Sequence, residues 1–187
     1  MQEPWFYALW TAGAYLLGSV STGDVVARVA GADIRALGTG NPGTANIYRE
    51  VGRAQGVAVF ALDFAKGAIA TVPPYVLGLP TWTGLIATAA VIMGHLFPAL
   101  WRLRGGTGLV VSMGAATGLL PVGALAGVAA TAAAAVGIKD LGYAGAAFFV
   151  VAALVGGLVH QDALAVIGVL LAGTAIFIKA RVQYRHR

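Results

Sequence analysis

The chain has 187 residues, of which 59% are hydrophobic and only 10% charged, and its mean hydropathy is +0.83. Soluble domains are about half apolar and about a quarter charged, so a water-soluble globule is excluded. The 27 glycines lie among Ala, Val and Leu, which excludes a disordered chain. The sequence contains no cysteine, so disulfides, thiolate nucleophiles and cysteine-ligated metals are excluded. We therefore expect an all-helical polytopic membrane protein, with residues 1–187 forming a single integral membrane domain.

The formal net charge is +5 at pH 7. A basic chain can bind nucleic acid, but in so apolar a sequence basic cytoplasmic loops are the simpler explanation. We expect membrane lipids as partners and no nucleic acid.

Seven apolar segments approach the roughly 20 residues that a transmembrane helix needs. No basic residue precedes the first, so we expect it to remain in the mature chain instead of being a cleaved signal peptide. Pro121 interrupts the stretch 108–138, which permits either one kinked helix or two short helices. The segments are 5–28, 55–79, 83–101, 108–120, 121–138, 142–160 and 163–179.

Basic residues decide between six and seven spans, because cytoplasmic segments gather Lys and Arg. Seven spans with the N-terminus outside put eleven of the twelve basic residues in inner segments, and Lys66 lies within a span. Six spans would put Lys139 and the basic tail outside. The charges predict seven transmembrane helices in the plasma membrane, with a cytoplasmic C-terminus and Gly-rich cytoplasmic or reentrant loops.

The long polar segment 29–54 contains the first of two glycine-rich motifs. Glycine permits positive φ and lets backbone N–H groups converge on an anion. Arg49 follows about one helical turn later and can clamp phosphate with two hydrogen bonds. The same glycines also suit a tight reentrant loop without a ligand. The motif residues are Gly38, Thr39, Gly40, Asn41, Gly43 and Asn46.

The second glycine-rich motif lies just before the apolar segment 108–120. The N-terminus of a helix favours an anion, and neighbouring arginines add positive charge. The spacing does not match a Walker-type loop. Because both motifs lie on one face of the membrane, they suggest a shared phosphate pocket. The motif residues are Arg104, Gly105, Gly106, Thr107 and Gly108.

Three ionisable residues are predicted within the membrane or at its interface. His95 is either functional or a structural histidine bonded to a loop carbonyl. Asp63 and Lys66 are three residues apart on one helical face, so we expect them to neutralise each other instead of acting directly in catalysis. The predicted topology separates His160 from the other two histidines, and we expect no metal site.

The order of several motifs resembles that of the bacterial acyl-phosphate:glycerol-3-phosphate acyltransferases of the PlsY type. The resemblance covers roughly residues 15–114 and includes Gly18-Ser19, Leu62-Asp63 and Gly94-His95. The predicted seven spans and outside N-terminus agree with that family. The motifs lie at residues 18–24, 33–35, 38–49, 62–67, 94–98 and 104–108.

This resemblance implies transfer of a fatty acyl group from acyl phosphate to the 1-hydroxyl of glycerol 3-phosphate, giving lysophosphatidic acid for phospholipid biosynthesis. It implies no cofactor, metal, acyl-CoA or acyl carrier protein, and we expect a monomer. Acyl phosphate is already activated, so the protein mainly positions two anions and stabilises an oxyanion. Thr39, Arg49 and His95 are the expected catalytic residues. The expected substrate-binding residues are Gly38, Gly40, Asn41, Gly43, Asn46, Lys66, Arg104, Gly105, Gly106, Thr107 and Gly108.

The sequence also departs from the family pattern. Thr39 replaces a serine, and Thr107 replaces a phosphate-binding lysine whose charge no nearby residue in the sequence restores. The family tail resembles Arg-His-Arg-x-Asn, whereas this chain has Lys-Ala-Arg-Val-Gln at 179–183 or Arg-His-Arg at 185–187. One lost charged contact costs about 1.5–3 kcal/mol. A divergent relative with a changed acceptor or lost activity, and a small lipid or anion transporter, are therefore alternative hypotheses.

Overall fold

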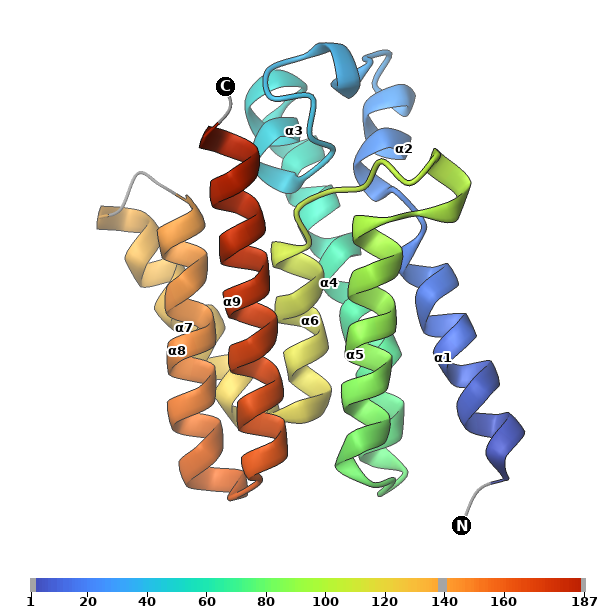
Figure 1. The fold of residues 1–187 in the computed structure, drawn as a ribbon. Helices are drawn as coiled ribbons and strands as arrows, with labels where there is room; N and C mark the ends of the chain where they lie inside the picture. Colours follow the sequence, from blue (N-terminus) through green and yellow to red (C-terminus); the bar gives the residue numbers. More distant parts are fainter. Residues whose placement is uncertain (1–2, 138–140, 186–187) are drawn as a thin grey trace.

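The computed structural model describes residues 3–137 and 141–185, and the regular structure within these ranges is entirely helical (Figure 1). Lys139 and residues 186–187, which entered the arguments from charge and from the tail, lie outside the described residues. The elements in chain order are α1 (Pro4–Gly18), α2 (Thr22–Val29), the 3-10 helix η1 (Ile34–Ala36), α3 (Thr44–Glu50), α4 (Arg53–Val76), α5 (Thr81–Leu96), the 3-10 helix η2 (Ala99–Trp101), α6 (Leu109–Leu119), α7 (Pro121–Gly137), α8 (Leu141–His160) and α9 (Ala163–Arg185).

The long helices run side by side in alternating directions (Figure 1). Helices α1, α5, α7 and α9 run toward the end at which the C-terminus lies, and α4, α6 and α8 run the opposite way. Helices α2 and α3 and the connecting segments cap the C-terminal end, whereas the N-terminus lies at the other end. We call this cap, residues 19–52 and 97–108, the polar end.

Four helical segments of the described chain are long and apolar enough to cross a membrane: Arg53–Val76, Thr81–Trp101, Tyr143–His160 and Ala163–Val182. Helices α6 and α7 are apolar but shorter, with 11 and 17 residues. At 1.5 Å per residue, 20 residues are needed to cross about 30 Å of hydrocarbon. The helical, apolar construction predicted from composition is confirmed.

The predicted single segment 5–28 is wrong, because the chain breaks between Gly18 and Thr22. The break is stabilised by residues of α4. Lys66 Nζ donates to Val20 O at 2.9 Å, and Thr22 Oγ1 donates to Asp63 Oδ1 at 2.5 Å. Backbone groups released from a buried helix need other partners. Lys66 supplies one for Val20 O and Asp63 holds the Thr22 side chain beside it, which the local hydropathy pattern does not reveal.

The stretch 108–138 forms two helices, because α6 ends at Leu119 and α7 begins at Pro121. Proline lacks an N–H donor and is tolerated at the first helical position. Leu120 between them has an extended φ of −139° and ψ of 72°. The two helices run in opposite directions (Figure 1). The alternative of one kinked helix is therefore wrong.

Small residues let α4 and α6 cross at close range. A Cβ atom on Gly67 would lie 2.1 Å from Val111 O, and one on Gly114 would lie 2.0 Å from Phe64 O. Only glycine fits where two helix backbones approach this closely, as is common in membrane helix bundles. This crossing fixes α6, and with it the second glycine-rich motif, against α4.

Candidate active site

A cavity of about 190 Å³ begins at the polar end and extends between α6, α8 and α9. Asn41 and Asn46 line it from the first glycine-rich segment, and Thr107 and Gly108 line it from the second. The structure therefore brings the two segments together, although 61 residues or more separate them in the sequence. The other polar lining residues are Thr44, Asp63, His95 and Thr131, and the apolar lining includes Met113, Phe149, Ile176 and Phe177.

The first segment turns sharply at two glycines. Gly38 and Gly40 have φ angles of +51° and +64°, a left-handed conformation that glycine adopts without steric cost. The Gly40 N–H donates to Leu37 O at 2.8 Å. The predicted turn is confirmed, but this N–H group bonds within the loop and does not face an anion.

Two asparagines hold the rest of this loop. Asn46 is buried, its Oδ1 accepts from the Thr39 N–H at 3.0 Å, and its Nδ2 donates to Leu37 O at 3.1 Å. Asn41 Oδ1 accepts from the Gly43 N–H at 3.2 Å. The expectation that the N–H groups of this segment point at a ligand is therefore wrong for Thr39 and Gly43. The asparagine side chains use them to fix the loop.

The second segment is anchored on the end of α5. The Gly105 N–H donates to Leu96 O and the Gly106 N–H donates to His95 O, both at 3.2 Å. A Cβ atom on Gly105 would lie 1.8 Å from His95 O, so glycine is required by packing. Two of the predicted anion-binding donors are thus engaged. The first N–H groups of a helix have no acceptor within the helix. The remaining donors are therefore those at the N-terminus of α6, where Leu109 lines the cavity.

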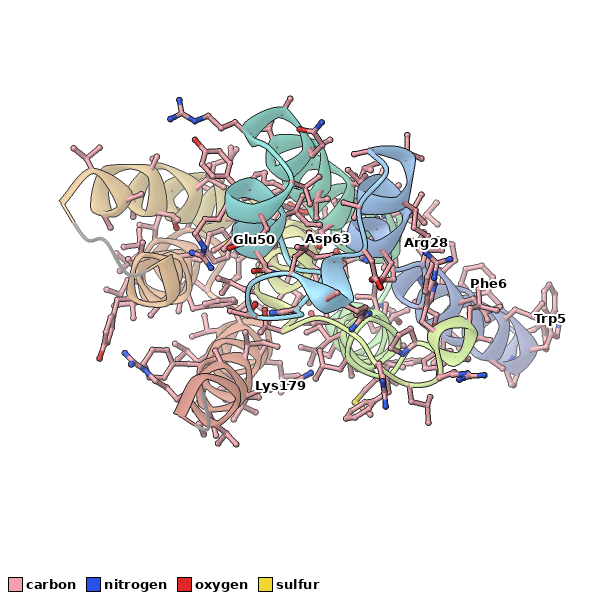
Figure 2. The ribbon with its side chains drawn as sticks, turned by 90° about the horizontal axis from the view of Figure 1, so that it is seen from above. Trp5, Phe6, Arg28, Glu50, Asp63 and Lys179 are labelled. Atoms are coloured by element: carbon pink, nitrogen blue, oxygen red, sulfur yellow. The ribbon has the colours of Figure 1, made fainter. Side chains whose placement is uncertain are left out.

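A pair of buried charges belongs to α4, and Asp63 of this pair lies near the middle of the bundle in Figure 2. Asp63 and Lys66 are 2% and 3% exposed, and their oxygen and nitrogen are 2.8 Å apart, which confirms the expected mutual neutralisation. Lys66 is absent from the cavity lining, so the structure does not place this predicted substrate-binding residue at the cavity. An unpaired buried charge would be costly, which explains the pairing.

His95 is the predicted catalytic residue that the structure does place on the cavity wall. It is 7% exposed, and its Nδ1 lies 3.9 Å from Asp63 Oδ1. A Cβ atom on Gly106 would lie 2.5 Å from His95 Nε2. The imidazole is therefore confined between the second glycine-rich segment and the buried carboxylate.

Thr39 and Arg49 are not among the residues that line the cavity. Thr39 is half-buried, and its Oγ1 accepts from the Asn41 N–H at 3.4 Å. Arg49 is exposed on α3, and within the described residues it has no hydrogen bond or ion pair. Arg104 also lies outside this cavity and contributes to a second hollow described below.

Lys179 is a site residue that the sequence analysis missed. Its Nζ donates to Gly106 O at 2.9 Å, and Figure 2 shows it extending from α9 toward the second segment. No residue near Thr107 in the sequence restores the charge of the lysine expected there, but the fold brings the Lys179 ammonium group to the neighbouring Gly106. The replacement comes from 72 residues further along the chain, where periodicity gives no signal. The next residue, Ala180, lines the cavity where the resemblance leads us to expect a histidine.

No group of three or more His, Asp or Glu side chains is placed to hold a metal ion in the part of the chain that the structure describes. The cavity instead offers a helix N-terminus, a histidine, a carboxylate and a nearby lysine beside an apolar channel. Such a site is suited to a ligand with an anionic head and an apolar chain.

Comparisons with known proteins agree with this geometry. The family model described as glycerol-3-phosphate acyltransferase matches residues 8–187. Glycerol-3-phosphate acyltransferase of Geobacter metallireducens is 40% identical over 114 residues, which are 61% of this chain and 59% of the relative. That of Aquifex aeolicus is 38% identical over 113 residues, which are 60% of this chain and 59% of the relative. The matched part thus spans about three fifths of the length of these curated relatives.

The fold is also that of a solved membrane enzyme. The crystal structure of PlsY, an integral membrane glycerol 3-phosphate acyltransferase, in its glycerol 3-phosphate form has a TM-score of 0.86 and 26% sequence identity. The match covers 96% of this chain and 90% of that chain. A lysophosphatidic acid form of the same protein gives a TM-score of 0.84. Sequence and helix arrangement agree, and the chain belongs to the glycerol-3-phosphate acyltransferase family of integral membrane proteins.

Proposed function

We propose that the protein transfers a fatty acyl group from acyl phosphate to the 1-hydroxyl of glycerol 3-phosphate, releasing phosphate and lysophosphatidic acid. The observation that carries the proposal is the single cavity that joins a polar end to an apolar channel. Acyl phosphate has the matching construction, with an anionic head on a chain that partitions into lipid. The family to which the chain belongs supports glycerol 3-phosphate as the acceptor.

The phosphate groups would bind near the N-terminus of α6. Its first N–H groups and its helix dipole favour an anion, and Lys179 adds a full positive charge at Gly106. Arg49 is exposed and has no partner within the described residues, so its guanidinium is available to clamp a phosphate that enters from the polar end. Thr107 and the buried Asn41 would contact the same ligand from the cavity wall.

The acyl chain would occupy the apolar channel between α6, α8 and α9. Met113 and Phe149 are buried there, and Ile176 and Phe177 complete the wall. Burial of each CH₂ group in such a channel contributes about 0.8 kcal/mol. The channel therefore favours long acyl donors over acetyl phosphate.

The reaction requires little covalent chemistry from the protein. The 1-hydroxyl oxygen attacks the acyl carbon, the bond from that carbon to the phosphate oxygen breaks, and the hydroxyl proton ends on the released phosphate. His95 polarises the hydroxyl, while the α6 N-terminus and Lys179 stabilise the developing negative charge. The Thr39 hydroxyl orients the loop from its place beside Asn41.

The membrane arrangement that we propose has seven spans, an outside N-terminus, a cytoplasmic C-terminus and a monomeric chain. The alternating helix directions and the opposite positions of the two termini support it (Figure 1). In this arrangement the polar end, with its many arginines, faces the cytoplasm, where positive charge is favoured. The segment 38–46 is then a cytoplasmic loop or enters the membrane surface from that side.

A changed acceptor is the second candidate function, and one observation favours it. Thr107 and Ala180 both line the cavity at positions where the resemblance leads us to expect a lysine and a histidine. Lys179 supplies one positive charge near the pocket, but the lysine and the histidine of the family pattern are both absent from its lining. The acceptor pocket is therefore less basic than the family pattern implies. An alcohol with fewer negative charges than glycerol 3-phosphate would then be accepted.

The test is turnover by the full chain in lipid nanodiscs, supplied with palmitoyl phosphate and glycerol 3-phosphate. We expect phosphate release and lysophosphatidic acid in equal amounts, and a loss of about 100-fold or more in His95→Gln. His160→Gln is the matched control, because His160 lies at the other end of α8 beside Tyr75 and should retain full turnover. Arg49→Ala tests the proposed clamp in the same assay.

Two outcomes would change the assignment. Turnover with glycerol or another alcohol, but not with glycerol 3-phosphate, would favour the changed acceptor. In sealed proteoliposomes, movement of either substrate across the bilayer without ester formation would identify a transporter instead of an enzyme.

A further inference from the structure

A second hollow, of about 610 Å³, lies at the polar end between α2, η1 and the loop 97–104. We call it the arginine pocket. Its lining carries four guanidinium groups and one carboxylate, and it shares no lining residue with the active-site cavity. The residues are Asp24, Arg28, Arg35, Leu100, Trp101, Arg102 and Arg104.

The one carboxylate is fully engaged. Arg35 Nε donates to Asp24 Oδ1 at 2.8 Å, Arg35 Nη2 donates to Asp24 Oδ2 at 2.5 Å, and Ser21 Oγ also donates to Oδ2. Within the described residues Arg28, Arg102 and Arg104 form no ion pair with a carboxylate. The arginine pocket therefore has an excess of three positive charges that nothing in the described chain neutralises.

The backbone keeps these arginines together despite their repulsion. Arg102 and Leu103 have φ angles of +52° and +60°, a left-handed conformation that is sterically unfavourable for residues with a side chain. The Leu103 N–H donates to Pro98 O at 3.0 Å, and Arg35 Nη2 donates to Arg104 O at 2.6 Å. Strain that is retained in a positively charged loop is a feature of ligand-binding sites.

Apolar side chains beside the arginines point to the source of the anion. Leu100 and Leu103 are 72% and 59% exposed in the same loop. The Arg28 guanidinium lies 4.7 Å from the centre of the Trp101 ring, and in Figure 2 Arg28 lies on the side of α2 that faces this loop. Exposed leucines with Arg and Trp are typical of the membrane interface, where chains contact the leucines and headgroups contact the cations.

We propose that the arginine pocket binds the phosphate headgroup of an anionic membrane phospholipid, separately from the substrates in the active-site cavity. Two or three guanidinium groups surround one phosphate, while the lipid chains lie over Leu100 and Leu103. The site is connected to the second glycine-rich segment by the bond from Arg35 to Arg104 O. This inference does not depend on the proposed reaction, because it is tested by binding.

The experiment measures retained lipid by native mass spectrometry on the full chain released from nanodiscs of phosphatidylcholine that contain phosphatidylglycerol. We expect one tightly retained phosphatidylglycerol, and about tenfold weaker retention in Arg28→Gln and in Arg102→Gln. Arg53→Gln is the matched control, because it removes an exposed arginine near the same end but outside the pocket. It should retain the lipid like the unmodified chain.

Three results would overturn the proposal. Equal loss in Arg53→Gln would show general attraction by the basic face instead of a site. Equal retention of phosphatidylcholine would exclude recognition of the anionic headgroup. Displacement of phosphatidylglycerol by inorganic phosphate at millimolar concentration, with no effect of Leu103→Ser, would identify a free-phosphate site in place of a lipid site.

Discussion

The two glycine-rich segments have similar compositions, but different forces hold them. The segment 38–46 is held from within, because Asn46 bonds to Thr39 and Leu37 on either side of the turn. The segment 104–108 is held from outside, by carbonyl groups at the end of α5 and by Lys179 of α9. The first is a self-supporting loop, whereas the second exists only where α5, α6 and α9 meet.

This difference shows that glycine serves two purposes in one site. Gly38 permits a left-handed turn, which is a requirement of the local chain. Gly105 and Gly106 instead permit close packing, since a Cβ atom on either would meet His95. Substitutions in the first segment should therefore affect stability, and in the second segment a substitution at Gly106, which faces the His95 side chain, should affect the geometry of catalysis.

The largest expected effect is a loss of folding stability when the first segment is altered. Asn46→Ala leaves the half-buried Thr39 N–H and Leu37 O without their partners, and each lost hydrogen bond costs about 0.5–1.5 kcal/mol. We expect a loss of roughly 1–3 kcal/mol in the free energy of unfolding, measured by denaturation in mild detergent. Asn46→Asp keeps the acceptor for Thr39 but buries a carboxylate against Leu37 O, so it should lose at least as much. Equal stability of both variants and the unmodified chain would contradict a self-supporting loop.

The second segment is tested with Gly106→Ala. The new Cβ atom would lie 2.5 Å from His95 Nε2, so the imidazole must move while the backbone remains in place. Misplacement of a catalytic group by about 1 Å costs on the order of 100-fold, and we expect that loss in kcat with little change in stability.

Two other glycines provide the comparison for this variant. Gly105→Ala should destabilise the fold instead, because its Cβ would meet the His95 carbonyl at 1.8 Å. Gly13→Ala, where the added atom meets nothing within 4 Å, should change neither kcat nor stability. Full activity of Gly106→Ala would remove His95 from the mechanism.

The contribution of α9 to substrate binding is tested by moving a positive charge from α9 to the second segment. Lys179→Met removes the cation that bonds to Gly106 O, and we expect the KM for glycerol 3-phosphate to rise about tenfold, a cost of about 1.4 kcal/mol. Adding Thr107→Lys to this variant returns an amine to the same segment and should lower the KM again. Failure of that rescue, together with a lower thermal midpoint for Lys179→Met, would assign Lys179 a structural role only.

The smallest expected effect lies far from both segments, in the turn between α8 and α9. A hydrogen bond from the Thr81 hydroxyl, at 2.5 Å, lowers the pKa of Asp162 below its ordinary 3.8, and the Ala165 N–H contributes at 3.0 Å. Because the folded pKa is depressed, this stabilisation is complete above about pH 4 and is lost as the pH falls through the folded value.

Asp162→Asn should therefore cost about 0.5 kcal/mol at pH 7, since asparagine still caps α9. The difference between the variant and the unmodified chain should shrink as the pH falls below the ordinary pKa of 3.8, measured as thermal midpoints in detergent. Turnover at pH 7 should be unchanged. A variant that loses turnover would show that the end of the molecule opposite the polar end is coupled to the active-site cavity.

Most of the helical segments could be predicted, because a buried apolar helix needs a long apolar run. The failure at 5–28 has a physical cause, since Asp63 and Lys66 stabilise a break that hydropathy does not show. At the site, His95, Asn41 and Thr107 were predicted and do line the cavity. Lys66 was predicted and does not, because its charge is used to neutralise Asp63.

The amino-acid sequence by itself determined the membrane class, the helical architecture and the left-handed turns, because hydropathy and glycine act through local chemistry. Only the tertiary structure decided which donors remain free, where the replacement cation comes from and which arginines gather in a second pocket. These properties depend on contacts such as Lys179 with Gly106 and Arg35 with Arg104. Those contacts join segments about 70 residues apart, and no local pattern encodes them.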